Sequence, residues 1–239
     1  MILIGQYDSP FVRRVGIALT LYQQPFEHKP WSVFGDMQKV QAYNPLVRVP
    51  TLVLDDGAVL IESHCILDYL DDLVGARRAL FPTTGVARRD AFKVAALATG
   101  LGDKAVSLFY ERRLHEQVSA AWVERCRAQI QGVARALEAD RGQKTGTYWF
   151  GERLGHVGSA VAAVLRFAGE ANPGLLAMAE FPAPAAPAAP GGLVGVSNHR
   201  TAVYSAGLRR QAHCTGRRAA LLCPQRSCCS RLCREARDE

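Results

Sequence analysis

The chain has 239 residues, 49% of them hydrophobic, and a formal net charge of +7, so it is long enough for two small domains. It contains no run of eighteen apolar residues that would predict a membrane-spanning helix. Lys and Arg number 20 against 19 Asp and Glu in residues 1–181, and 9 against 3 in residues 182–239. The body is therefore close to neutral, which argues against a nucleic-acid-binding fold. The N-terminus shows no signal-peptide pattern, so we expect a cytoplasmic protein with no membrane partner.

The first predicted elements are a short buried strand and a helix. Residues 2–4 are apolar, Ser9 is a favoured helix N-cap, and Pro10 suits the first helical position because its missing N–H has no partner there. We expect this helix to run from Pro10 to Leu21. The first amides of a helix and the positive end of its dipole favour an anion. Ser9 is therefore a candidate for holding a thiolate, beside its plain role as a cap.

The next segments continue a mixed strand and helix pattern. Residues 26–31 predict a second strand, short and at an edge because it contains a proline, and residues 34–41 predict a weak helix. The Val49–Pro50 step then precedes the apolar run 51–54. In an X-Pro bond the cis form costs only roughly 0.5–1 kcal/mol. A cis turn here would leave the Val49 backbone free to pair with an extended peptide, as an added strand does.

A further strand and helix complete the N-terminal pattern. Residues 58–61 predict the strand, and Glu62 and Ser63 open the helix that follows. The order over residues 2–73 is thus β-α-β-α-β-β-α.

Three motifs in this order resemble the glutathione transferase family. They are Ser9 ahead of an Arg-Val-x-Ile-Ala-Leu helix, the Asn-Pro…Val-Pro-Thr-Leu segment that starts at Asn44, and the Glu62-Ser63 pair. The chain is most similar to the serine-type bacterial, zeta-like branch, which includes maleylacetoacetate isomerases. The resemblance spans residues 1–181 and is densest before residue 75.

The resemblance implies a function and the residues that carry it. Ser9 would donate a hydrogen bond to the thiolate of glutathione, the co-substrate. The Val49 backbone, with Pro50 in the same turn, would pair with the cysteinyl part, while Glu62 and Ser63 would hold the γ-glutamyl amine and carboxylate. The partners implied are glutathione, a small electrophilic substrate that is conjugated or isomerised, and a second copy of the chain in a homodimer.

Helical patterns replace strand patterns beyond residue 84, at 86–115 and 120–140. Strands followed by helices indicate an α+β, thioredoxin-like domain and then an all-α one. Phe109 and Tyr110 are candidates for contact with the electrophile, although an aromatic on such a helix is more often plain core. The expected division is a thioredoxin-like glutathione-binding domain at 1–75, a linker at 76–84, an all-helical domain at 85–181 and a disordered tail at 182–239.

The family's buried core helix is expected at Ala160–Ala168, and its usual start is altered. The family places Ser or Thr at the N-cap and Asp three residues later, whereas this chain has Gly155 and Gly158 there. A missing cap costs about 0.5–2 kcal/mol, and a glycine early in a helix adds up to about 1 kcal/mol. We expect a serious loss against a total stability of roughly 5–15 kcal/mol.

The tail departs from the family pattern. Residues 182–192 are rich in proline and glycine and cannot form a helix interior. We interpret residues 182–239 as an out-of-frame or unselected C-terminus. A zinc module is the rival reading, but the tail cysteines form no Cys-x-x-Cys pair, so no metal site is expected. These cysteines are Cys214, Cys223, Cys228, Cys229 and Cys233.

Two other functions stay open. The chain is alternatively a glutathione-binding protein or a damaged family member without transferase activity, because the N-terminal domain can bind glutathione even where the helical domain builds no electrophile pocket. A thiol–disulfide oxidoreductase is disfavoured, since Ser9-Pro10-Phe11-Val12 stands at the redox-motif position without a cysteine.

Overall fold

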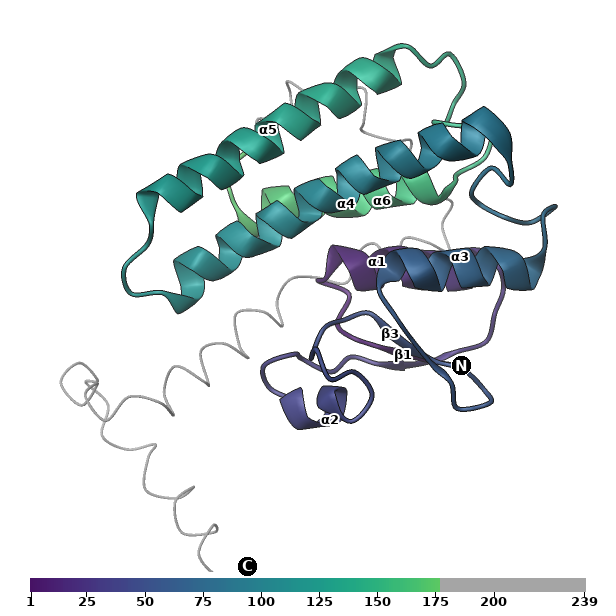
Figure 1. The fold of residues 1–239 in the computed structure, drawn as a ribbon, viewed down its shortest axis with the longest axis horizontal. Coiled ribbons are helices and arrows are strands. Elements are labelled where there is room, and N and C mark those ends of the chain that lie inside the picture. Colours follow the sequence, from purple (N-terminus) through teal and green to yellow (C-terminus); the bar gives the residue numbers. More distant parts are fainter. Residues whose placement is uncertain (177–239) are drawn as a thin grey trace, which may run out of the picture. The chain divides into compact units, whose positions relative to one another are not determined.

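The computed structural model of this chain describes residues 1–176, and it confirms the predicted fold class (Figure 1). Strands and helices alternate first, and only helices follow, which gives an α+β, thioredoxin-like N-terminal part and a helical C-terminal part. The elements are β1 (Ile2–Ile4), α1 (Pro10–Leu21), β2 (Glu27–Lys29), α2 (Met37–Gln41), β3 (Thr51–Val53), β4 (Val59–Ile61), α3 (Ser63–Val74), α4 (Gly85–Leu114), α5 (Ala120–Gly142) and α6 (His156–Ala171). The tail expected at 182–239, with its five cysteines, lies outside the described residues.

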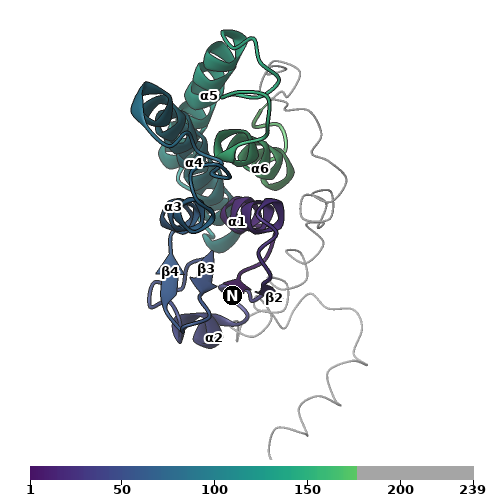
Figure 2. The same cartoon turned by 90° about the vertical axis from the view of Figure 1, so that its right-hand side faces the viewer.

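The sheet has the order β2-β1-β3-β4, with β1 and β2 parallel and the other neighbours antiparallel. Strand β2, which ends just before Pro30, lies at an edge, as predicted. Side chains alternate across the sheet, because successive residues of a strand point to opposite faces. Leu3 and Leu52 join the core with α1 and α3, whereas Ile4 and Val53 meet Val40 of α2. Figures 1 and 2 show α1 and α3 side by side over one face and α2 on the other.

The helical part packs around α6. Helix α6 is buried along most of its length and lies against α4 and α1, while α5 packs on α4. The shared core is aliphatic, and its fully buried members include Leu101, Leu108, Ile130, Leu137, Val161 and Val164. Because α1 belongs to the N-terminal part, its contact with α6 joins the two parts through a buried helix–helix interface. Among the described residues, no helix is both long and apolar enough to cross a membrane.

Helix α6 begins earlier than expected, and a tertiary contact replaces the missing cap. Gly155 is the N-cap and makes no side-chain capping bond, as its sequence implies. The amide of His156 instead donates to the carbonyl of Leu80 in the linker, at 3.2 Å. A Cβ on Gly155 would lie 2.7 Å from that carbonyl oxygen, which is too close for any side chain. The linker therefore occupies the place of a capping side chain.

A buried polar network holds the same junction together. His156 Nε2 lies 2.9 Å from Asp71 Oδ1, the Tyr22 hydroxyl donates to the same carboxylate, and the amides of Leu80 and Phe81 also donate to it. Burial alone would raise the pKa of Asp71, but its hydrogen bonds from His156, Tyr22 and the Leu80 amide hold it below its ordinary value. Burial lowers the pKa of His156, so its imidazole is neutral in the fold. Helices α1, α3 and α6 and the linker are thereby tied at one carboxylate.

Replacement of His156 by Gln tests this network through the pH dependence of stability. The folded pKa of His156 lies below the unfolded value, so its contribution is fully present above about pH 6.5 and is lost as the pH falls toward the folded pKa. We expect the wild type to lose up to roughly 1 kcal/mol more than His156→Gln between pH 7.5 and 5.5, measured by urea unfolding. Asp8 and His64, whose pKa values are also shifted, are present in both proteins. The Asp8 shift has no contribution from His156 and the His64 shift comes chiefly from its own burial, so both largely cancel in this comparison. Equal losses in the two proteins would contradict a neutral, buried His156.

Candidate functional site

Ser9 is the N-cap of α1, in the loop that follows β1, as the sequence predicted. Its hydroxyl oxygen accepts the amide hydrogen of Val12 at 3.4 Å, and its own amide donates to the carboxylate of Asp8 at 2.8 Å. Among residues 1–176, no group accepts the hydrogen of the Ser9 hydroxyl. The side chain is half-buried. An available O–H donor therefore stands at the positive end of a twelve-residue helix.

Asp8 is an unusual neighbour for this hydroxyl. Burial raises the pKa of its carboxyl group to about 6, against the opposing effects of the Ser9 amide and Arg13. Its Oδ2 atom is buried and has no hydrogen-bond partner among the described residues. Close to neutral pH, this carboxyl group therefore carries a negative charge that is poorly solvated.

The Val49–Pro50 turn lies against the start of α1. The peptide bond between the two residues is cis, and in the described part of the chain no hydrogen bond joins the Val49 backbone to another residue. Gly5 permits the close approach, since a Cβ there would lie 2.7 Å from Val49 Cβ and 2.6 Å from Val12 Cγ2. Gly5 also has φ 127°, a value that side chains rarely allow. An unpaired stretch of backbone therefore lies beside the first turn of α1.

Glu62 and Ser63 stand at the first turn of α3, and the backbone there is strained. Glu62 has φ 66° and Val47, in the loop before the cis turn, has φ 50°. Such angles are uncommon for residues other than glycine and cost of order 1–3 kcal/mol each. The surrounding structure holds these strained angles at Val47 and Glu62, which both lie close to the Val49–Pro50 turn in the chain or in the cavity. Strained backbone of this kind is common at functional sites. Ser63 itself is 2% exposed.

Four of the predicted site residues line a single cavity. Val49, Pro50, Glu62 and Ser63 surround a space of about 60 Å³. The same cavity is also lined by Phe11, Asn44, Arg48 and His64 from the N-terminal part and by Thr99 and Asp103 of α4. Ser9 is not among the lining residues, although Phe11 on the first turn of its helix is. The structure thus brings the Val-Pro and Glu-Ser motifs together and adds a wall from the helical part.

Two contacts connect this wall to the N-terminal part. His64 Nε2 lies 2.9 Å from Thr99 Oγ1, and burial lowers the pKa of His64 to about 4, so the imidazole is neutral. Arg48 Nη1 lies 3.2 Å from Glu62 Oε1, and its Nη2 lies 3.9 Å from Asp103 Oδ1. Asp103 could not be identified from the sequence, because helical spacing alone does not show which part of α4 faces the N-terminal motifs.

Arg14 opens the Arg-Val-x-Ile-Ala-Leu motif, but no role in the site was assigned to it from the sequence. Its side chain is completely buried, and burial lowers its pKa to about 9. Nη1 donates to Ser63 Oγ at 3.4 Å, whereas Nε and Nη2 have no hydrogen-bond partner among the described residues. The motif places Arg14 on the predicted helix, but helical spacing alone does not show that its side chain turns toward Ser63. A buried guanidinium therefore stands behind the serine at the start of α3.

The two aromatic candidates lie in different surroundings. Phe109 is 6% exposed and packs near Phe167 of α6, with ring centroids 6.4 Å apart. Tyr110 is half-buried and meets the ring of Phe34 edge-on at 5.4 Å. Since Phe34 precedes α2, Tyr110 faces the N-terminal part and Phe109 the helical interior. Neither residue lines the 60 Å³ cavity.

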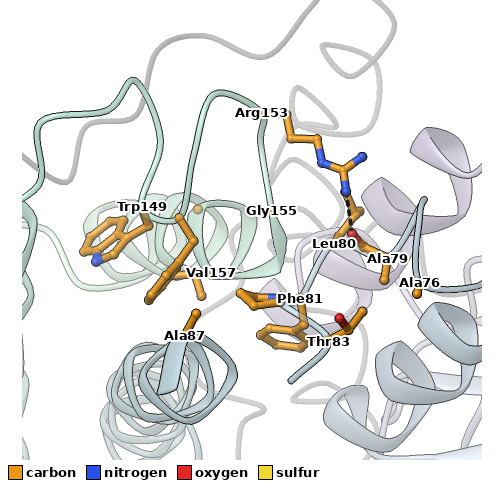
Figure 3. Close-up of a pocket in the computed structure, with 13 residues that line it drawn as sticks. Ala76, Ala79, Leu80, Phe81, Thr83, Ala87, Trp149, Arg153, Gly155 and Val157 are labelled. Atoms are coloured by element: carbon orange, nitrogen blue, oxygen red, sulfur yellow. Dashed lines mark hydrogen bonds between the residues drawn. The ribbon is translucent and has the colours of Figure 1, made fainter. Parts of the chain in front are cut away.

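A larger cavity of about 390 Å³ lies elsewhere, between the linker and the start of α6 (Figure 3). Phe81, Trp149 and Val157 are among its lining residues, and Arg153 at its rim donates to the carbonyl of Ala79 at 2.8 Å. It contains none of the predicted site residues. Within residues 1–176, no three His, Cys, Asp or Glu side chains are grouped to hold a metal ion.

Comparisons with known proteins agree with the motifs. The family model of the glutathione S-transferase N-terminal domain matches residues 3–78. The GST-like protein YibF of Escherichia coli (strain K12), itself uncharacterized, is 32% identical over 139 residues, which cover 58% of this chain and 68% of YibF. Glutathione S-transferase U4 of Arabidopsis thaliana is 27% identical over 116 residues, or 48% of this chain and 44% of the relative. The chain thus spans less than half of this plant relative.

Solved structures match over a longer stretch. A glutathione S-transferase of Methylobacterium radiotolerans in complex with glutathione sulfonate has a TM-score of 0.71 and 27% identity, and covers 85% of this chain and 92% of its own. A glutathione transferase family member from Pseudomonas fluorescens Pf-5 with bound glutathione has a TM-score of 0.65 and 26% identity, with coverages of 85% and 97%.

Replacement of Arg14 by Met tests whether this arginine is retained for stability. A buried charge without a carboxylate partner is costly, and a similar apolar side chain in its place is often neutral or stabilising. We expect Arg14→Met to unfold at the same or a higher temperature than the wild type, measured by calorimetry, whereas Arg14→Ala loses roughly 2–4 kcal/mol because it leaves a cavity. A loss in Arg14→Met as large as that in Arg14→Ala would show that the charge itself stabilises the fold.

Proposed function

Because this chain belongs to the glutathione S-transferase family, we propose that it activates the thiol of glutathione for attack on a small electrophile. The observation that carries the proposal is the Ser9 hydroxyl at the start of α1, whose hydrogen no described residue accepts. Ser9 donates this hydrogen to the thiolate and remains protonated itself. Ser9 thus acts as a hydrogen-bond donor and not as a nucleophile, and this role defines a serine-type enzyme.

The energy needed for activation is within reach of this geometry. A thiol with a pKa of about 8.5 is only a few per cent ionised at pH 7. Lowering that pKa by about two units needs roughly 2.7 kcal/mol of selective stabilisation of the thiolate. A hydrogen bond to an anion contributes about 1.5–3 kcal/mol, and a helix N-terminus about 0.3–2 kcal/mol. Ser9 and the first turn of α1 together are sufficient.

The remaining motifs bind the rest of glutathione. The unpaired backbone of Val49, fixed by Pro50, pairs with the cysteinyl residue as an added strand would. Glu62 accepts hydrogen bonds from the γ-glutamyl ammonium group. Ser63, at the start of α3, holds the carboxylate, since a helix N-terminus favours an anion.

The electrophile would lie between the two parts of the chain. Tyr110 supports this placement, because it reaches Phe34 across the junction, with Phe109 packed behind it. Product analysis distinguishes conjugation from the isomerisation typical of zeta-like enzymes. A chain that binds glutathione without turnover would instead be a binding protein or an inactive member of the family.

The domain division, the location and the assembly complete the proposal. Residues 1–75 form the glutathione-binding domain, 76–84 the linker and 85–181 the helical domain, in a cytoplasmic homodimer. The strand and helix bounds and the family membership support this division. Light scattering of the purified protein, with a mass of twice 26.0 kDa as the expected result, tests the dimer.

The decisive experiment is replacement of Ser9 by Ala. Calorimetric titration of the wild type with reduced glutathione should show saturable binding, with about one site per chain. In Ser9→Ala we expect nearly unchanged affinity, and a turnover with a simple aryl halide that is roughly 10- to 100-fold lower at pH 7. Raising the pH toward 9 should restore part of the rate, because the bound thiol then ionises without help.

Ser119 provides a matched control. It is the N-cap of α5 and accepts the Trp122 amide hydrogen at 3.3 Å, the same local arrangement as at Ser9. Ser119→Ala therefore loses a cap of the same kind, worth about 0.5–2 kcal/mol, and should keep its turnover. If Ser9→Ala is as active as Ser119→Ala, Ser9 serves only as a cap.

A further inference from the structure

Asp8 places a carboxyl group at the same helix end that Ser9 caps. Its Oδ1 atom accepts the amide hydrogen of Ser9 at 2.8 Å, so the carboxyl group lies against the first turn of α1. The positive end of a helix dipole favours an anion close to it. Before any ligand binds, this end of α1 therefore already holds one acidic group. A thiolate that accepts the Ser9 hydroxyl hydrogen would be a second anion at the same place.

The surroundings of Asp8 do little to weaken its charge. The residue is 9% exposed, and its Oδ2 atom is buried without a hydrogen-bond partner among the described residues. The charged side chain that acts on Asp8 is Arg13, and Arg166 and Glu170 of α6 act in turn on Arg13. Arg13 is buried too, and its Nε and Nη1 atoms reach no hydrogen-bond partner in residues 1–176. Charges in such a site interact more strongly than they do in water.

We propose that the charge of Asp8 opposes ionisation of the glutathione thiol at Ser9, so that this thiol ionises most readily while Asp8 is protonated. The inference rests on the proposed function and names a residue that regulates the same site. Two like charges that share a site disfavour each other, and their protons leave in two coupled steps. Burial raises the pKa of Asp8 to about 6, so its charge changes just below neutral pH. Asp8 therefore sets how much of the stabilisation from Ser9 and the helix end is realised at a given pH.

Asp8→Asn tests this inference directly. Asparagine has nearly the same shape as aspartate, and its carbonyl oxygen can still accept the Ser9 amide hydrogen. The thiol of bound glutathione is titrated through the ultraviolet absorbance of its thiolate, in complexes with the wild type and with the variant. We expect the pKa of the bound thiol to be roughly 0.5–1 unit lower in Asp8→Asn than in the wild type, because one negative charge is removed.

The pH dependence of turnover separates this effect from damage to the fold. At about pH 5, Asp8 is mostly protonated in the wild type, so the two proteins should convert a simple aryl halide at the same rate. At about pH 7, Asp8 is mostly ionised, and we expect Asp8→Asn to be roughly 2- to 4-fold faster. A loss of packing would instead change the rate by a similar factor at both pH values.

Asp56→Asn is the matched control. Asp56 Oδ1 accepts the Ala58 amide hydrogen at 2.9 Å, which is a local bond of the same kind, but the residue is exposed in the turn after β3. Because Val53 pairs with Ile2, this turn lies at the end of the sheet where β1 begins, whereas Ser9 follows the other end of β1. The control should leave the pKa of the bound thiol and the turnover as in the wild type.

The outcomes separate this inference from the proposed function. A thiol pKa in Asp8→Asn that equals or exceeds that of the wild type complex would refute the role of Asp8, while a wild-type value below about 8.5 upholds the proposed function. A wild type that leaves the thiol at about 8.5, or that does not bind glutathione, would overturn both. Thermal unfolding checks that each variant folds. If Asp8→Asn does not, Asp8→Ser removes the same charge with a smaller side chain, and the same downward shift is expected.

Discussion

Helix α1 is buried on nearly all sides, and its packing determines how the other elements are placed. The helix packs against β1 and α3 in the N-terminal part and against α6 in the helical part, so almost no side of it is left for solvent. Even Arg13 and Arg14 are buried in the process, at a cost in desolvation that few folds accept. A helix held on all sides has a fixed axis, and its first turn then presents Ser9 in one defined direction.

The junction between the two parts is held by polar contacts of the linker. Asp71 collects hydrogen bonds from α1, from the linker amides and from His156 on α6, and the Leu80 carbonyl takes the place of a capping side chain at Gly155. These bonds lie in a buried site, where electrostatic interactions are stronger than in water and an unmade bond is costly. At the start of α6, a hydrogen bond to a linker carbonyl therefore stands in for the missing capping side chain.

Several residues of the candidate site are held in arrangements that lower the stability of the ligand-free chain. Val47 and Glu62 hold strained backbone angles, Arg14 leaves buried donors unpaired, and Asp8 keeps a poorly solvated carboxyl group beside Ser9. Each of these features costs free energy in the ligand-free chain. Their concentration around one cavity and one helix start is typical of a site that is completed by its ligand.

The order of elements, the cap at Ser9 and the edge position of β2 could be predicted from the sequence, because these depend on local periodicity, capping and proline chemistry. The sequence also supplied the Val49–Pro50 and Glu62-Ser63 motifs, whose convergence on one cavity follows from the sheet order. Tertiary packing brings Asp103 to the cavity that Glu62 lines, places Arg14 behind Ser63 and sets the Leu80 carbonyl at the start of α6. Such pairings join residues tens of positions apart. They depend on how rigid helices pack, which no local pattern encodes.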